Sequence, residues 1–94
     1  MATKEAYKIA WEGVKTPVEP ADGKCFTLDE LQSFVGGYIE MVDIADNKTI
    51  ILNEEGKVRG MIPNGMATKM AEGFIDPDDV IVGNVLVTDR AYLR

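Results

Sequence analysis

The residues best suited to binding a ligand are two basic side chains and the asparagine–glycine pair that follows them. Lys57 and Arg59 occupy alternate positions in "KVRGMI", and Asn64 and Gly65 open the segment "NGMATKM". Free N–H groups at the start of a helix attract anions, and basic side chains add charge-assisted hydrogen bonds. This pattern predicts a site for a nucleotide or a phosphorylated metabolite. The candidate ligand-binding residues, which include further donors and a ring, are Tyr38, Asn53, Lys57, Arg59, Asn64 and Gly65.

The same residues also have a purely structural interpretation. Asparagine is a frequent N-cap because its side-chain oxygen accepts from the first free N–H groups of a helix. In that interpretation Asn64 caps a short helix, and Lys57 and Arg59 are solvated. Helix caps far outnumber anion sites, so the ligand site is the alternative hypothesis and not the leading one.

The sequence lacks the residues that most enzymes use for acid–base or nucleophilic chemistry. It contains no histidine, which removes the commonest general base and the commonest metal ligand. Cys25 has no second cysteine to pair with and is expected to be a small, partly buried apolar residue. Asp76, Asp78 and Asp79 do not match a calcium loop and are expected to form a solvated turn. We therefore expect no catalytic residues, no metal site, no cofactor and no enzymatic activity.

Length and charge describe one acidic domain. The chain of 94 residues leaves room for a single core, so we expect one domain over residues 1–94. The net charge of -6 arises from 16 acidic and 10 basic residues that are interleaved, which argues against direct nucleic-acid binding. One cysteine, no signal-peptide pattern and no apolar run of membrane-spanning length predict a cytoplasmic protein that does not contact membranes.

A helix is predicted over "TLDELQSFV", with its start and its end both encoded. Thr27 and Glu30 have the spacing of a capping box. Gly36 is expected to adopt the left-handed conformation that ends many helices, and Gly37 to let the chain turn sharply into "YIEMVDI". A phosphate-binding glycine loop would need the reverse order, with a strand before it and a helix after it.

Apolar patterns predict the strands of a mostly antiparallel sheet. "AYKIAWE" is expected to be the first strand, and "GVKTPVEPADGK" a loop with at most a short extended piece. "YIEMVDI" and "KTIILN" flank the turn "ADN" and predict a hairpin. In "NEEGK", Asn53 is expected to bond its own backbone and Gly56 to adopt positive φ, which leads into a third strand, "KVRGMI". "VIVGNVLVTD" is expected inside the sheet, with Gly83 at a bulge or a close approach.

A second, short helix within "PNGMATKMAEGF" completes the predicted elements, with Pro63 ahead of its N-cap and Gly73 as its stop. The order of elements predicts an α+β domain with a single, mostly antiparallel sheet of about four to five strands and two short helices packed on it. The residues expected to act structurally are Thr27, Glu30, Gly36, Gly37, Gly56, Gly73 and Gly83.

Three stretches resemble a known kind of domain: "LQSFVGGYIEMVDI", "NEEGKVRGMIPNGMAT" and "DDVIVGNVLV". They are similar to a small domain of unknown function found in bacteriophages, plasmids and large DNA viruses. The resemblance covers residues 27–88. It implies a mobile-element origin and an accessory role, without an established activity. The family-type positions are Gly36, Gly37, Tyr38, Glu40, Asn53, Gly56, Asn64 and Ala67.

These observations favour a non-enzymatic accessory binding domain of phage or plasmid type. It is expected to engage a host protein or to form a homodimer in the cytoplasm of the host cell. The alternative is a protein that binds and sequesters a small ligand, either a nucleotide or a phosphometabolite.

Overall fold

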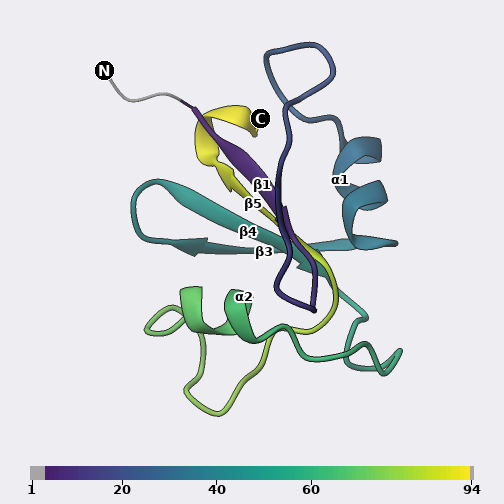
Figure 1. Ribbon diagram of the computed structural model, residues 1–94, viewed down its shortest axis with the longest axis vertical. Helices are drawn as coiled ribbons and strands as arrows, with labels where there is room; N and C mark the ends of the chain where they lie inside the picture. Colours follow the sequence, from purple (N-terminus) through teal and green to yellow (C-terminus); the bar gives the residue numbers. More distant parts are fainter. Residues whose placement is uncertain (1–3, 94) are drawn as a thin grey trace.

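Five antiparallel strands form one sheet, in the spatial order β2-β1-β5-β4-β3. Figure 1 shows the succession β1, β5, β4 and β3. The computed structural model describes residues 4–93. The elements in chain order are β1 (Ala6–Ile9), β2 (Lys15–Pro17), α1 (Leu28–Val35), β3 (Ile39–Ile44), β4 (Lys48–Asn53), α2 (Gly65–Met70), β5 (Val85–Asp89) and the 3₁₀ helix η1 (Arg90–Tyr92). The predicted α+β fold, with one sheet and two helices, is therefore confirmed.

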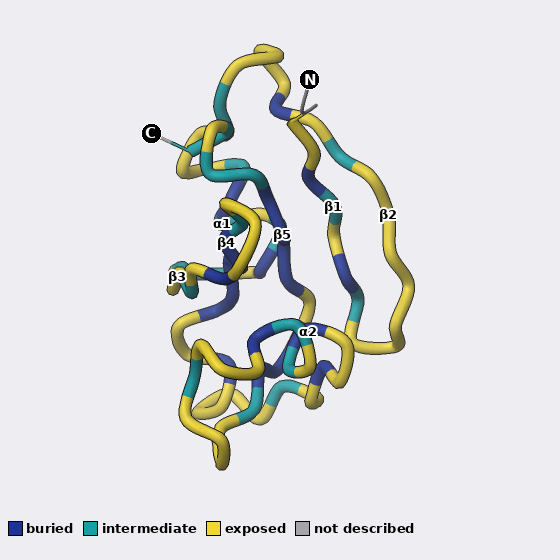
Figure 2. Tube along the Cα trace, turned by 90° about the vertical axis from the view of Figure 1, so that its left-hand side faces the viewer, coloured by how far each residue is buried: buried dark blue, intermediate teal, exposed yellow. Residues whose placement is uncertain are grey.

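The last strand, β5, lies in the middle of the sheet, between β1 and β4. Val85 and Val87 belong to one core cluster and Leu86 to another, so both faces of β5 are covered. A strand that is covered on both faces needs apolar residues at successive positions and not only at alternate ones. Figure 2 shows β4 and β5 as the buried centre of the sheet, with β2 and β3 at its margins.

The two helices cover opposite faces of the sheet. On one face, Leu31 and Val35 of α1 pack with Phe26 against the sheet. On the other face, Ala67 of α2 and the following Ala71 are fully buried against it. We call these the α1 face and the α2 face. Within residues 4–93, no helix has the length and apolar character needed to cross a membrane.

Both ends of α1 follow from its sequence. Glu30 N–H donates to Thr27 Oγ1 (3.1 Å) and Thr27 N–H donates to the Glu30 carboxylate (2.8 Å), which confirms the capping box. Gly36 is the expected left-handed C-cap, with φ of 80°. Gly37 is needed for another reason, because a Cβ there would lie 3.0 Å from Asn53 Nδ2. The second glycine therefore provides space for a neighbouring side chain.

The predicted β3–β4 hairpin is confirmed. Asp46 (φ 61°) and Asn47 (φ 60°) both have positive φ at its turn. This is the type I′ pattern, whose twist matches that of the flanking strands. Ile44 pairs with Lys48 in the ladder, while the Lys48 N–H donates to Ala45 O (3.3 Å). Two residues on one side therefore face one on the other, which is a bulge next to the turn.

The predicted third strand of a meander, "KVRGMI", is wrong, because residues 57–60 form turns. The Arg59 N–H donates to Glu55 O (2.9 Å) and the Met61 N–H donates to Gly56 O (2.9 Å). These local bonds satisfy the backbone groups that a strand would have offered to a neighbour. Gly60 has φ of 69°, which interrupts an extended chain.

The extents of two other strands also differ from expectation. β5 begins at Val85, five residues later than "VIVGNVLVTD" suggested, because Gly83 has φ of 80° and breaks the extended run. The close approach expected at Gly83 is confirmed, since a Cβ there would lie 2.8 Å from Met61 Sδ. β1 ends at Ile9 because the Ala10 N–H and Val14 O then close a turn (2.9 Å) into β2, which lies where a loop was expected.

Two glycines do not act as expected. Gly56 is not among the residues with positive φ; a Cβ there would instead lie 2.7 Å from Val82 Cγ2, so this glycine is needed for space. Gly73 does have positive φ, but α2 ends at Met70 with Ala71 as its C-cap, so Gly73 lies beyond the helix.

The side chain of Asn53 does bond its own backbone turn, because Oδ1 accepts from the Glu55 N–H (2.8 Å).

Candidate functional site

Asn64 is the N-cap of α2, and its polar side-chain atoms are in use within the protein. It is completely buried. Its amide donates to Ile9 O (3.1 Å) and Gly83 O (2.9 Å), and its Oδ1 accepts from the Ala67 N–H (3.1 Å). Gly65 begins α2, which has six residues. These contacts give Asn64 a structural role, because they join α2 to the end of β1 and to the segment before β5.

The remaining candidate ligand residues lie on or near β4 and the turns that follow it. Asn53 is buried and donates to Val35 O (3.1 Å), at the end of α1. Lys57 forms an ion pair with Asp79, and Arg59 Nη1 donates to Gly36 O (3.2 Å).

Of these residues, Asn53 and Lys57 line a common cleft that does not include the other candidates. Tyr38 immediately precedes β3 and is 63% exposed. Lys57 and Arg59 are therefore engaged by a carboxylate and a carbonyl oxygen of the protein itself. The strand β3, next to β4, is the more exposed of the two strands.

The sheet has two edges, and they differ in length and composition. β2 has three residues and ends with Pro17, which has no N–H group. The Val18 N–H donates to Ala6 O, so by alternation Lys15 and Pro17 carry the backbone groups that point away from β1. Proline at such a position blocks pairing with another strand. β3 has six residues and no proline.

The hydrogen-bond pattern of β3 identifies which backbone groups are free. The Glu54 N–H donates to Tyr38 O (2.9 Å), so Tyr38 is in a hydrogen-bonded pair with β4. Hydrogen-bonded and non-hydrogen-bonded pairs alternate along an antiparallel ladder. Ile39, Met41 and Asp43 therefore point their N–H and C=O groups away from β4. These groups form a row along the open margin of the sheet.

An apolar hollow borders β3 on the α1 face. Its volume is about 370 Å³. Met41 is 50% exposed and Leu28 is 57% exposed, and both lie at this hollow. Leu28, the first residue of α1, is thus open to solvent beside β3. The full lining is Phe26, Thr27, Leu28, Leu31, Ile39, Met41 and Leu93.

A cleft of about 310 Å³ borders the same strand on the α2 face. Val42, Leu52 and Ile75 contribute apolar surface to it, and Glu40 and Glu54 contribute carboxylates. Lys57 and Asp79 also line this cleft and are paired with each other, and this hydrogen bond lowers the pKa of Asp79. The open margin is therefore flanked by a hollow on each face, one apolar and one partly acidic.

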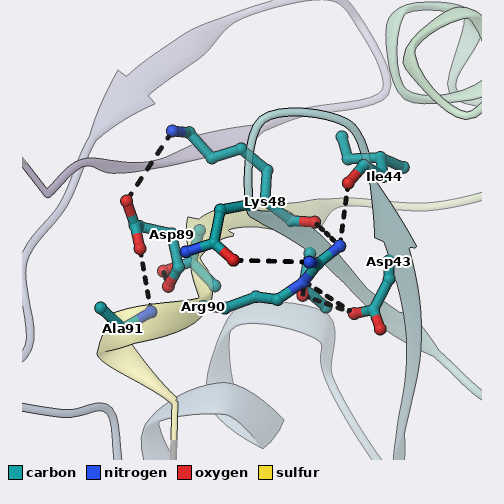
Figure 3. Close-up of polar contacts among 9 residues, drawn as sticks. Asp43, Ile44, Lys48, Asp89, Arg90 and Ala91 are labelled. Atoms are coloured by element: carbon teal, nitrogen blue, oxygen red, sulfur yellow. Dashed lines mark hydrogen bonds and ion pairs between the residues drawn. The ribbon is translucent and has the colours of Figure 1, made fainter. Parts of the chain in front are cut away.

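Arg90 fixes the hairpin end of β3 (Figure 3). Its Nη2 donates to Ile44 O (2.9 Å) and to Lys48 O (3.2 Å), and its Nε lies 3.3 Å from an Asp43 carboxylate oxygen. Thr49 Oγ1 also donates to Asp43 (2.8 Å). The carboxylate of Asp43 is thus occupied, whereas the side chains at the middle of β3 remain open.

We name β3 with its two bordering hollows the β3 margin. Sequence reasoning named Tyr38 as a candidate ligand-binding residue but did not name Met41, Leu28 or Glu40 as site residues. The available signal was weak: "YIEMVDI" alternates apolar and acidic residues, which is also the pattern of any strand with one solvated face. Only the order of strands shows that β3 lies at a margin. Within residues 4–93, no group of three or more acidic or cysteine side chains is arranged to hold a metal ion.

The fold and this margin define a class: a small α+β domain with a single antiparallel sheet and one open edge strand. The chain belongs to the family described as Domain of unknown function (DUF3846), which matches residues 7–92. That range includes both helices, four of the strands in full and all of β1 except Ala6. Comparison with curated proteins and with solved structures gives no match.

Proposed function

We propose that this protein is a binding domain that adds an extended segment of a partner protein to its sheet at β3. The observation that carries the proposal is the β3 margin itself. Here a six-residue edge strand without proline presents free backbone groups between two hollows. Strand addition uses such a geometry, because backbone hydrogen bonds give affinity and side-chain hollows give specificity.

The contrast between the two edges supports this choice of surface. Soluble proteins blunt edge strands by shortening them or by placing proline at outward positions. β2 has both devices, with three residues and Pro17 at an outward position. β3 has neither, and Met41 at its centre is half exposed. An edge left open beside exposed apolar side chains fits a surface that is covered by a partner.

The contacts of the basic residues give less support to an anionic small ligand. Lys57 is paired with Asp79, and Arg59 donates to a backbone carbonyl oxygen. The cleft that includes Lys57 also carries Glu40 and Glu54, which repel a phosphate. A protein partner is therefore the proposed ligand. We further propose that it comes from a host cell, since the resemblance to domains of mobile elements implies an accessory role.

A proline scan of the two edges tests the proposal. Met41→Pro removes an outward N–H of β3 without removing a bond to β4, and Lys15→Pro removes an outward N–H of β2 as the matched control. Met41→Ala separates the loss of the side chain from the loss of the N–H. Peptides selected on the wild-type protein from a random library, each long enough to span β3, serve as probes.

We expect the selected peptides to shift the amide resonances of Ile39, Met41 and Asp43. Met41→Pro should weaken binding by about tenfold or more through the lost hydrogen bond and the blocked approach. Lys15→Pro should bind as the wild type does, and Met41→Ala should lie in between. Peptides that bind Met41→Pro as tightly as the wild type, or a library that yields no binder, would contradict the proposal.

A further inference from the structure

We infer that the segment added to β3 alternates apolar and cationic side chains, with the apolar ones on the α1 face and the cationic ones on the α2 face. This inference rests on the proposed strand addition and names the chemistry of its partner. Residues that lie directly opposite each other in paired strands project to the same face of the sheet. Each of the two hollows beside β3 would therefore contact every second residue of the added segment.

On the α1 face, the added side chains would enter the hollow beside Met41 and Leu28. Both residues are half exposed or more, and the rest of the lining is mostly apolar. Burying apolar surface here is favourable by about 25 cal/mol for each Å² removed from water. The nearest acid on this face of β3, Asp43, is already engaged by Arg90 and Thr49. Apolar side chains therefore match this face.

On the α2 face, the added side chains would meet Glu40 and Glu54. Both are exposed and both line the cleft on this side. Among residues 4–93, no lysine or arginine forms an ion pair with either carboxylate, because the nearby Lys57 is held by Asp79. Cationic side chains placed opposite acidic ones stabilise paired strands, and like charges destabilise them. Lysine or arginine therefore matches this face.

A second copy of this chain is a poorer occupant of the same margin. Pairing two copies about Glu40 would place the two carboxylates directly opposite each other. Pairing about Met41 would place them at diagonal positions on one face, about 7 Å apart. Each copy also carries a net charge of -6, so the two molecules repel each other at low ionic strength. The acidic side chains of the β3 margin therefore favour a basic partner segment over a second copy of this chain.

A charge-swap experiment with defined peptides tests the inference. The probes are the peptide Thr-Val-Lys-Val-Lys-Val-Thr and its counterpart with glutamate in place of lysine. The variant Glu40→Lys/Glu54→Lys reverses the charge of the margin. The variant Glu12→Lys/Glu19→Lys makes the same change in net charge at exposed positions near the opposite edge and serves as the matched control. Affinities and amide shifts are measured by NMR titration at low and at high salt.

We expect the lysine peptide to bind the wild type at least about fivefold more tightly than the glutamate peptide at low salt, and this ratio to shrink at high salt. The ratio should invert in Glu40→Lys/Glu54→Lys and keep its direction in the control variant. Shifts should centre on Ile39, Met41 and Asp43.

The remaining outcomes separate the two proposals. Equal binding of both peptides at β3 overturns the charge inference and leaves strand addition standing. Absence of shifts at β3 with either peptide overturns both. A native mass of two chains that Met41→Pro returns to one chain would identify a second copy as the occupant, which overturns the inference about a basic segment.

Discussion

The side-chain amide of Asn64 donates to the carbonyl oxygen of Ile9 at 3.1 Å, across 55 positions of the chain. The same amide donates to Gly83 O at 2.9 Å. Asn64, the residue immediately before α2, therefore connects this helix to the end of β1 and to the segment that leads into β5. Because Asn64 is completely buried, water does not compete for these bonds.

Replacing Asn64 tests how much this junction contributes to stability. Asn64→Ala removes the cap of α2 and leaves the two buried carbonyl oxygens without these donors. We expect the free energy of unfolding to fall by about 3 kcal/mol. Asn64→Ser keeps an acceptor for the Ala67 N–H and should recover only the capping part, about 1 kcal/mol. Urea unfolding measures both. Full recovery by serine would mean that the bonds to Ile9 and Gly83 contribute nothing.

Arg90 should stabilise the hairpin mainly through backbone carbonyl oxygens. Arg90→Lys loses the planar group that reaches Ile44 O and Lys48 O together, and we expect a cost of about 1–2 kcal/mol. Asp43→Asn removes only the exposed ion pair and should cost less than about 0.5 kcal/mol. Chemical unfolding in low and high salt distinguishes the two contributions. A larger effect of Asp43→Asn than of Arg90→Lys would show that the charge pair dominates.

Replacing Gly36 and replacing Gly37, its neighbour in the chain, should disturb the structure for different physical reasons. Gly36→Ala meets no neighbour within 4 Å, so its cost is that of a left-handed residue with a Cβ, about 1 kcal/mol. Gly36→Asn should cost less, because asparagine tolerates this conformation. Gly37→Ala must instead displace the Asn53 amide, which lies 3.0 Å from the added Cβ. In Gly37→Ala, crystallography should therefore show the Asn53 side chain shifted by a few tenths of an ångström, with a longer bond to Val35 O. An unmoved Asn53 would refute this explanation.

The capping box predicts a specific dependence of stability on pH. Hydrogen bonds from the Thr27 N–H and then from the Ala21 N–H lower the pKa of Glu30 below its ordinary value of 4.5. A carboxyl whose pKa is lower in the folded state stabilises the fold above its unfolded pKa, and this contribution is lost as pH falls through the folded pKa. We therefore expect the Glu30 contribution to be complete above pH 4.5 and to disappear below it.

Glu30→Gln provides the comparison for this pH effect. Glutamine retains one acceptor oxygen, which serves only one of the two N–H groups, and it does not titrate. The variant should therefore lose less stability than the wild type between pH 5 and pH 3. Urea midpoints across this range measure the difference. Parallel pH profiles would assign the acid sensitivity to other carboxyls, of which Asp79 also has a lowered pKa because Lys57 bonds to it.

The features that the sequence determined are those with short-range causes. The capping box at Thr27, the left-handed stop at Gly36 and the turn that ends β3 each depend on neighbours within a few positions, and each is present. The N-cap role of Asn64 was likewise readable as one of two alternatives. Local geometry restricts these residues regardless of what packs around them.

The structure decided everything that depends on which segments meet. Residues 57–62 looked like a strand by composition, but residues 57–60 form turns and Ile62 O accepts from the Gly83 N–H (2.7 Å). β2 is present where a loop was expected because it pairs with the edge of β1. Placing β5 between β1 and β4 left β3 at the margin, with Met41 and Leu28 exposed. An alternating apolar pattern does not indicate whether a strand will have a neighbouring strand on both sides. Long-range pairing decides which strand lies at the edge of the sheet, and therefore where the proposed binding surface is.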